Sequence, residues 1–308
     1  MNRVFCIVGP TATGKSALAA DVAVRLGGEI VSADAFQIYA GFDLLSAKPD
    51  KRILHQVPHH LIGAVRANER MSAARYRALA MSAIGDISSR GKVPLLVGGS
   101  GLYVKALTHG LLETAGSEPQ LRRDLNELAI DQLRKRLTDL DPVAAETVDL
   151  NNRRRVVRAI EIALLGGKPA SLQRTQWKSA GEKPSRAVDS FGVFVFRDRE
   201  ELYQRINQRV EAILRDGALE EVRSAGQVST TVDQMIGIQD IRQYLRGEIS
   251  LPECVAKIQQ ATRRYAKRQL TWFRHQTNFV PLNLSLLSHN EAVQWVSRRA
   301  IAGRAVND

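Results

Sequence analysis

The chain has 308 residues, 44% hydrophobic and 25% charged, proportions that are typical of a folded globular protein and argue against a disordered or fibrous one. Its 44 Lys and Arg residues outnumber its 32 Asp and Glu residues, and the net charge of +12 favours a polyanionic partner. No apolar run approaches the length of a membrane span and no signal-peptide pattern precedes the first strand, so we expect a cytoplasmic protein with no membrane partner.

The first predicted element is a strand over residues 4–8, and it leads directly into the sequence GPTATGKS. This sequence matches the P-loop pattern G-x-x-x-x-G-K-S/T, in which backbone N–H groups and the start of the next helix bind phosphate oxygens. In such a loop Lys15 neutralises phosphate charge, and the hydroxyl of Ser16 can hold Mg²⁺. The predicted phosphate or diphosphate site therefore comprises Gly9, Pro10, Thr11, Ala12, Thr13, Gly14, Lys15 and Ser16.

The next predicted elements alternate between helices and buried strands, as in a doubly wound parallel α/β sheet. A helix over 17–26 ends at Gly27, and a strand over 29–33 is followed by Asp34. Asp34 thus lies at the carboxyl end of a strand, the edge at which ligands bind in such sheets. The same design recurs in a helix over 71–90, a strand over 94–97, a glycine turn over 98–101 and a helix from about residue 102.

The alternation stops after about residue 112, where charged, Leu-spaced segments replace the strands. A strand over 191–196 restores the core pattern, and three helices are predicted after it, over 199–216, 218–225 and 252–274. A polar stretch over 168–186 indicates a loop. The predicted organisation is a P-loop NTPase-like parallel sheet core over 1–112 and 191–290, a helical insertion over 113–190 and a C-terminal tail over 291–308.

The helix predicted over 252–274 is strongly basic, and the chain has no acidic residue between Glu253 and Glu291. At 100° per residue its basic side chains occupy an arc of about 140°, opposite an apolar face. Either a solvated face or a polyanion-binding surface fits this pattern, and the missing acids favour the second because solvated faces usually mix signs. The basic residues are Lys257, Arg263, Arg264, Lys267, Arg268 and Arg274.

A P-loop alone fits NTP-driven switches, small-molecule kinases and transferases that release diphosphate, so other residues must decide between them. Motors and switches usually carry an Asp at the end of a buried strand, but the strand over 94–97 ends in glycines and the one over 191–196 ends at Arg197. Asp34 is the best-placed carboxylate. It fits a secondary metal ligand, a base for an incoming nucleophile or a helix cap.

Clustered histidines suggest a metal site, and this chain has His55, His59 and His60 close together. A proline between them breaks helical ligand spacing, and no Cys or carboxylate set accompanies them. Packing or hydrogen bonding near the substrate explains them better. Cys6 and Cys254 are far apart and form neither a disulfide framework nor a metal-binding spacing, so we expect reduced thiols.

Five segments carry a family resemblance through their order and combination: GPTATGKSALA, SADAFQIYAGFDLLSAKPD, PHHLI, PLLVGGSGLYVKAL and TRRYAKRQLTWFR. Together they resemble the tRNA dimethylallyltransferase family, over nearly the whole chain up to about Asn278. The resemblance implies a P-loop α/β core whose helical insertion embraces the tRNA anticodon stem-loop. It also implies transfer of a dimethylallyl group from dimethylallyl diphosphate to N6 of adenosine 37, in tRNAs that read codons beginning with U, by a Mg²⁺-dependent monomer.

The same resemblance assigns roles to individual residues. Asp34 matches the base of the family and Arg209 its diphosphate clamp, and both act beside Lys15 and the Mg²⁺ ligand Ser16. The positions that surround the reactive adenine match Ala35, Phe36, Gln37, Ser100 and Gly101. The remaining tRNA-binding positions match Arg154, Arg155, Val156, Val157, Arg158, Arg264, Lys267 and Arg268.

Some positions depart from the family pattern. Ala35 stands where the family has Ser, Leu45 and Ser46 replace Gly and Thr, and Ile238 replaces an aromatic Tyr. These changes leave the diphosphate-binding residues intact and bear on tRNA selectivity.

Three other functions fit part of the sequence. A prenyltransferase acting on free AMP, ADP or ATP would share the P-loop and Asp34, but it would need neither the insertion nor the basic helix. A small-molecule kinase would bind ATP at the P-loop. An RNA-binding protein with a vestigial site would not require the intact Lys15, Ser16 and Asp34.

Overall fold

The computed structural model describes residues 3–111, 118–166, 171 and 188–305, so the loop predicted over 168–186 lies outside the described residues except at Ser171. The chain forms two compact units, and each is described by itself. We call residues 1–109 with 188–308 the core unit and residues 110–187 the helical unit. The corresponding boundaries expected from the sequence are 112 and 190.

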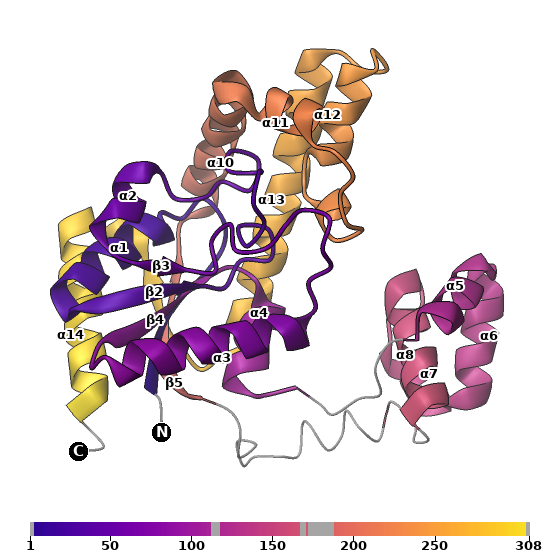
Figure 1. The fold of residues 1–308 in the computed structure, drawn as a ribbon, viewed down its shortest axis with the longest axis horizontal. Coiled ribbons are helices and arrows are strands. Elements are labelled where there is room, and N and C mark those ends of the chain that lie inside the picture. The colour runs from indigo at the N-terminus through magenta and orange to yellow at the C-terminus, as the bar shows by residue number, and fades with distance from the viewer. Residues whose placement is uncertain (1–2, 112–117, 167–170, 172–187, 306–308) are drawn as a thin grey trace. The chain divides into compact units, whose positions relative to one another are not determined.

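The core unit is built on a six-stranded sheet with the order β3-β2-β4-β1-β5-β6, in which every pair of neighbouring strands is parallel (Figure 1). The strands are β1 (Arg3–Val8), β2 (Gly28–Ser32), β3 (His59–His60), β4 (Val93–Gly98), β5 (Asp189–Phe196) and β6 (Val280–Asn283). This confirms the predicted α/β class with a parallel sheet. The two edge strands β3 and β6 were not predicted, because each is too short to show an apolar pattern.

Alternation along β1 divides the core between the two faces of the sheet. Val4, Cys6 and Val8 belong to one buried cluster, and Phe5 and Ile7 belong to another. This is the two-residue period that a strand covered on both faces requires. The first cluster extends into α3 (Ala73–Ser89), α4 (Gly101–Thr108) and the helices from α10 (Arg199–Ile213) to α13 (Leu251–Gln276), and the second into α1 (Lys15–Leu26) and α14 (His289–Ala305).

The helix starts and ends that were predicted for the core unit lie within three residues of the observed ones, whereas the helices over Lys51–Gln56 and Ile238–Leu245 were not predicted. Ser72 caps α3 through its hydroxyl, and Ser250 with Glu253 forms a capping box at the start of α13. The helices are α1 (Lys15–Leu26), α2 (Lys51–Gln56), α3 (Ala73–Ser89), α4 (Gly101–Thr108), α10 (Arg199–Ile213), α11 (Leu219–Ser224), α12 (Ile238–Leu245), α13 (Leu251–Gln276) and α14 (His289–Ala305). A π-helical turn over Leu214–Ala218 connects α10 to α11, and short 3-10 turns cover Val232–Gln234 and Leu284–Leu286.

The prediction of a C-terminal tail over 291–308 was wrong. The helix α14 covers most of this segment and lies beside α1, as Figure 1 shows. Its Ala292, Val293, Val296 and Ala300 are buried, a spacing that places all four on one face of a helix. Ser288 and Glu291 exchange capping hydrogen bonds at its start. The segment is therefore part of the core unit.

The helical unit contains α5 (Pro119–Glu127), α6 (Ile130–Leu140), α7 (Pro142–Thr147) and α8 (Arg153–Gly166). These helices enclose a small apolar core that includes Leu133, Leu137 and Ile160. The fully buried Glu161 accepts a hydrogen bond from Arg122 Nε at 2.7 Å, which satisfies a charge that would otherwise be costly to bury. Within the described part of the chain, none of the helices has the length and apolar character that crossing a bilayer requires.

Candidate active site

The P-loop connects β1 to α1 at the carboxyl edge of the sheet, and its glycines have specific tasks. Gly9 has φ 154°, and a Cβ at this position would lie 2.0 Å from the carbonyl oxygen of Val195. Gly14 has φ 95° and starts α1 from the left-handed region. Ala12 has φ 63° although it is not a glycine, so the loop holds it in an unfavourable conformation.

Two side chains of the loop bond back to it. Lys15 Nζ donates to the carbonyl oxygen of Pro10 at 2.6 Å, and the buried hydroxyl of Thr13 donates to the same oxygen at 3.0 Å. Burial lowers the pKa of Lys15 to about 7; the nearby Asp34 carboxylate opposes this shift and the Arg209 guanidinium adds to it. A lysine with this pKa gains its full charge when an anion arrives.

Three arginines donate hydrogen bonds to the phosphate loop, each to a different loop residue. Arg209 of α10 donates from Nη1 to Thr11 Oγ1 at 3.0 Å. Arg205 donates from Nε to the carbonyl oxygen of Ala12 at 2.9 Å. Arg197, at the end of β5, donates from Nε to the carbonyl oxygen of Thr13 at 2.9 Å. Burial lowers the pKa of Arg209 and Asp34 opposes this shift, so Lys15 and Arg209 lie within electrostatic reach of the same carboxylate.

Asp34 follows β2 at the same edge of the sheet. Its Oδ1 accepts hydrogen bonds from the backbone N–H groups of Phe36 at 3.0 Å and Gln37 at 3.3 Å, as in an Asx turn. Among the described residues, no group donates to the second oxygen, Oδ2. Residues 35–38 form a turn and no helix begins there, so Asp34 is not a helix cap: its Oδ1 closes the turn, and its Oδ2 is available to a ligand.

The glycine turn after β4 brings a third chain segment to this edge. Ser100 accepts a hydrogen bond from the Ala35 N–H through its Oγ at 2.8 Å, and its own N–H donates to the carbonyl oxygen of Ala33 at 3.0 Å. A Cβ at Gly98 would lie 2.2 Å from the same Ala33 oxygen, and one at Gly101 would lie 2.4 Å from the Trp272 ring. These glycines thus permit the segments to approach closely.

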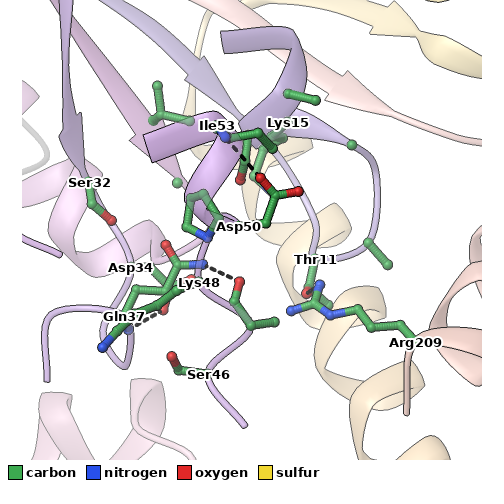
Figure 2. A pocket seen from close by; sticks show the side chains of 18 of the residues that line it. Thr11, Lys15, Ser32, Asp34, Gln37, Ser46, Lys48, Asp50, Ile53 and Arg209 are labelled. Atoms are coloured by element: carbon green, nitrogen blue, oxygen red, sulfur yellow. Dashed lines mark hydrogen bonds between the residues drawn. The ribbon is translucent and has the colours of Figure 1, made fainter. Parts of the chain in front are cut away.

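The P-loop and Asp34 face one cavity of about 690 Å³ in the core unit. Figure 2 shows Thr11 and Arg209 on one side of it and Asp34 with Gln37 on the other. Of the predicted site residues, those that line the cavity are Thr11, Ala12, Gly14, Lys15, Ser16, Asp34, Gln37 and Arg209. The other predicted residues of this region are not among those that line the cavity: Gly9, Pro10, Thr13, Ala35, Phe36, Ser100 and Gly101.

Sequence reasoning missed three residues that contact the loop: Arg197, Arg205 and Gln269. Gln269, in α13, accepts a hydrogen bond from the Thr11 N–H through Oε1 at 2.9 Å. The available signal was periodicity, because Gln269 lies on the same face of α13 as Ile258 and Phe273, where only buried residues are expected. Nothing in the sequence indicates the partners of the two arginines.

Two histidines of the cluster, His59 and His60, make separate hydrogen bonds. His59 Nδ1 lies 2.8 Å from the carbonyl oxygen of Val57, and His60 Nε2 lies 2.8 Å from Glu29 Oε2. Arg90 also pairs with Glu29, and these hydrogen bonds lower the pKa of the Glu29 carboxyl to about 2. In the described residues, no three His, Cys, Asp or Glu side chains come together as a metal site.

The basic helix α13 presents its cations to solvent. Arg264, Lys267 and Arg268 are exposed, whereas Ala266 and Phe273 are buried in the core unit. Arg263 differs, because its Nη1 donates to Asn207 Oδ1 at 2.7 Å. In the described part of the chain, no acidic side chain pairs with Arg264 or Lys267.

The predicted tRNA-binding residues of the helical unit differ in exposure: the arginines reach the surface and the valines are buried. Arg154 and Arg155 are exposed, and Arg158 pairs with Glu161 at 3.3 Å. Val156 and Val157 are buried in the apolar core of the unit, so their side chains cannot contact RNA. The helical period turns these two side chains inward, and the assignment of Val156 and Val157 as tRNA-binding positions stays a prediction.

Comparison with known proteins identifies the family. The family model described as IPP transferase matches residues 37–276, more than half of the chain. A tRNA dimethylallyltransferase of Geobacter metallireducens is 43% identical over 287 residues, which cover 91% of this chain and 92% of the relative. A protein of the same name from Acetivibrio thermocellus is 39% identical over 302 residues, which cover 95% of each chain.

Two solved structures are similar over almost the whole chain. The tRNA isopentenylpyrophosphate transferase of Bacillus halodurans is 33% identical with a TM-score of 0.72, and the match covers 98% of this chain and 96% of that one. A eukaryotic dimethylallyltransferase acting on tRNA is 26% identical with a TM-score of 0.79, with 98% and 78% covered. The chain belongs to the IPP transferase family.

Proposed function

We propose that this protein transfers a dimethylallyl group from dimethylallyl diphosphate to N6 of adenosine 37, in tRNAs that read codons beginning with U. The products are N6-(dimethylallyl)adenosine in the tRNA and free diphosphate. The observation that carries this proposal is one cavity that is lined by residues of the P-loop, by the cations Lys48, Arg205 and Arg209, and by the carboxylate Asp34. The named tRNA dimethylallyltransferases among the relatives support the choice of substrates.

The leaving group defines the task of the P-loop. When the bond between the allylic carbon and the diphosphate oxygen breaks, the electron pair stays on diphosphate, and its new charge needs stabilisation. Lys15, Arg209 and the N–H groups at the start of α1 supply it. Because these groups are held by hydrogen bonds to the loop, little reorganisation is required during the reaction.

The residues around Ser16 fit a Mg²⁺ ion that is bound together with diphosphate. Mg²⁺ typically takes one or two protein ligands and completes its shell with substrate phosphate oxygens and water. Ser16 lines the cavity at the start of α1 and supplies a hydroxyl ligand of this kind. When bound, the ion would offset charge on the leaving diphosphate.

Asp34 has the geometry of the base. The adenine N6 amine loses a proton as its nitrogen bonds to the allylic carbon, and a carboxylate oxygen without another donor can accept it. Asp34 Oδ1 is held by two backbone N–H groups, which orients Oδ2 as the free acceptor. Attack on the side of the allylic carbon opposite the diphosphate places the acceptor between the P-loop and Asp34.

The exposed cations of α13, Arg264, Lys267 and Arg268, are proposed to bind the phosphates of the anticodon stem-loop, as are Arg154, Arg155 and Arg158 in the helical unit. Contacts with phosphates position RNA without reading its sequence. A free nucleotide substrate would have no use for this surface. The same proposal treats the protein as a monomer that acts on tRNA in the cytoplasm.

The test supplies the protein with Mg²⁺ and labelled dimethylallyl diphosphate, together with either unmodified tRNA carrying adenosine at positions 36, 37 and 38 or free AMP. Nucleoside analysis then locates the label. We expect label on adenosine 37 of the tRNA. Label on AMP would show an adenylate prenyltransferase, and label on neither acceptor would overturn the proposal.

A further inference from the structure

We infer that Gln269 is a positioning residue that holds the phosphate loop in its binding conformation from α13; the inference rests on the proposed function of this site. Gln269 accepts from the Thr11 N–H through Oε1 at 2.9 Å and donates from Nε2 to the carbonyl oxygen of Gly99 at 2.9 Å. One partner is a donor and the other an acceptor, so only one orientation of the side-chain amide satisfies both.

Because Gln269 is buried, its side-chain amide needs both hydrogen bonds to replace those it would make with water. The residue is 5% exposed and shares its face of α13 with the buried Ala266 and Phe273. A buried amide without partners is destabilising, so an apolar residue would be better at this position if packing were its only task.

The glycine turn is shaped to receive this part of α13. A Cβ at Gly99 would lie 2.3 Å from Gln269 Nε2, and a Cβ at Gly101 would lie 2.4 Å from the ring of Trp272. Because Gln269 and Trp272 are three residues apart, they lie on the same side of the helix. The turn after β4 therefore fixes the distance at which Gln269 reaches the phosphate loop.

The effect of Gln269 on the loop begins at Thr11. Its N–H is engaged by Gln269 and its hydroxyl accepts from Arg209, so this residue is held from two helices. The next residue, Ala12, has φ 63°, a left-handed conformation that is unfavourable for a residue other than glycine. Loss of the Gln269 bond would release this conformation, and the following N–H groups would no longer converge on diphosphate.

The experiment compares Gln269→Met with Gln260→Met, a matched change at an exposed position of the same helix. Isothermal titration with Mg²⁺ and inorganic diphosphate measures loop affinity, and urea unfolding measures stability. We expect Gln269→Met to bind diphosphate about tenfold more weakly at a temperature where it is fully folded, because a buried donor and acceptor lose their partners. Gln260→Met should bind like the natural protein. Equal affinity of all three proteins would overturn the inference, since a packing role would change the unfolding midpoint and leave diphosphate affinity unchanged.

A second measurement uses the natural protein and so does not depend on the folding of a variant. The amide proton of Thr11 should exchange slowly with solvent in the absence of diphosphate, because Gln269 accepts it. Fast exchange of this proton would also overturn the inference. Neither measurement involves RNA, so a protein whose diphosphate affinity depends on Gln269 but which transfers no label to tRNA would contradict only the proposed function.

Discussion

The cations of the phosphate loop and the cations of α13 are held in opposite ways. Lys15 and Arg209 are partly buried, are hydrogen-bonded to the loop and have lowered pKa values. Arg264 and Lys267 are exposed and, among the described residues, have no acidic partner. Fixed cations in a low-dielectric site stabilise developing charge, whereas solvated cations attract a polyanion and release its counterions. Substitutions in the first group should therefore change catalysis and diphosphate binding, and substitutions in the second should change salt-dependent RNA binding.

The largest effect should come from Asp34, the carboxylate that influences both buried cations. Asp34→Asn keeps an oxygen for the N–H groups of Phe36 and Gln37 but removes the proton acceptor, so turnover should fall about 10²- to 10⁴-fold. Single-turnover transfer of labelled dimethylallyl measures the loss. Affinities for diphosphate and RNA should stay unchanged, and turnover near that of the natural protein would exclude Asp34 as the base.

The buried cation Lys15 should make diphosphate binding pH-dependent. Its pKa is lowered to about 7, so the ligand-free protein loses the ammonium charge as the pH rises above 7. Bound diphosphate favours the charged form, hence binding above pH 7 takes up a proton and affinity falls with rising pH.

Titration calorimetry in buffers of different ionisation enthalpy measures this proton uptake. In Lys15→Met, the remaining proton uptake comes from the titration of diphosphate itself. The difference in proton uptake between the natural protein and this variant is due to Lys15. Identical proton uptake by both proteins would contradict the lowered pKa.

The exposed cations should show a smaller and salt-sensitive effect. Arg264→Ala or Lys267→Ala should weaken binding of the anticodon stem-loop and reduce the slope of log affinity against log salt by about 1 for each. Diphosphate affinity should not change. Arg223→Ala removes an exposed arginine of α11 that pairs with Glu220, and serves as the control. Salt slopes that match the control would mean that α13 does not contact phosphates.

The smallest effects should come from the arginines of α8, of which Arg153 stabilises the helical unit and Arg155 binds RNA. Arg153 Nη2 donates to the carbonyl oxygen of Asn126 at 2.6 Å and to that of Leu128, so it closes the end of α5. Arg153→Ala should lower the free energy of unfolding of the helical unit by about 1–2 kcal/mol and leave RNA affinity unchanged in the folded protein. Arg155→Ala should weaken RNA binding and leave the free energy of unfolding unchanged. Thermal unfolding and filter binding check both, and equal behaviour would show that the two arginines share one task.

The sequence predicted those parts of the site that one continuous segment determines. The P-loop could be recognised because its glycines and its Lys-Ser pair occupy fixed positions within eight residues, and Asp34 because it directly follows a buried strand. Arg197, Arg205 and Gln269 could not be found in this way, since their partners are loop atoms far away in the chain. The α/β class followed from periodicity, but the short strands β3 and β6 carry too few residues to show a period.

The helix at the end of the chain shows a different limit. Its apolar residues have helical spacing, and Ser288 with Glu291 forms a capping pattern, so the information was present. The segment lies beyond the motifs that carry the family resemblance, so only its own apolar spacing could indicate the helix. Similarly, the helical period distinguishes Val156 and Val157 from their arginine neighbours, although all belong to one stretch.

The hydrogen bond between Thr11 and Gln269 also bears on how the chain acquires its activity. Its two residues are 258 positions apart, so the phosphate loop emerges from the ribosome long before the helix that holds it. At synthesis rates of about 5–20 residues per second, the interval is on the order of tens of seconds. During this time β1 and α1 can form while the diphosphate site stays incomplete. Nascent chains that end before α13 should thus bind neither diphosphate nor tRNA productively, which makes completion of the chain the step that switches the site on.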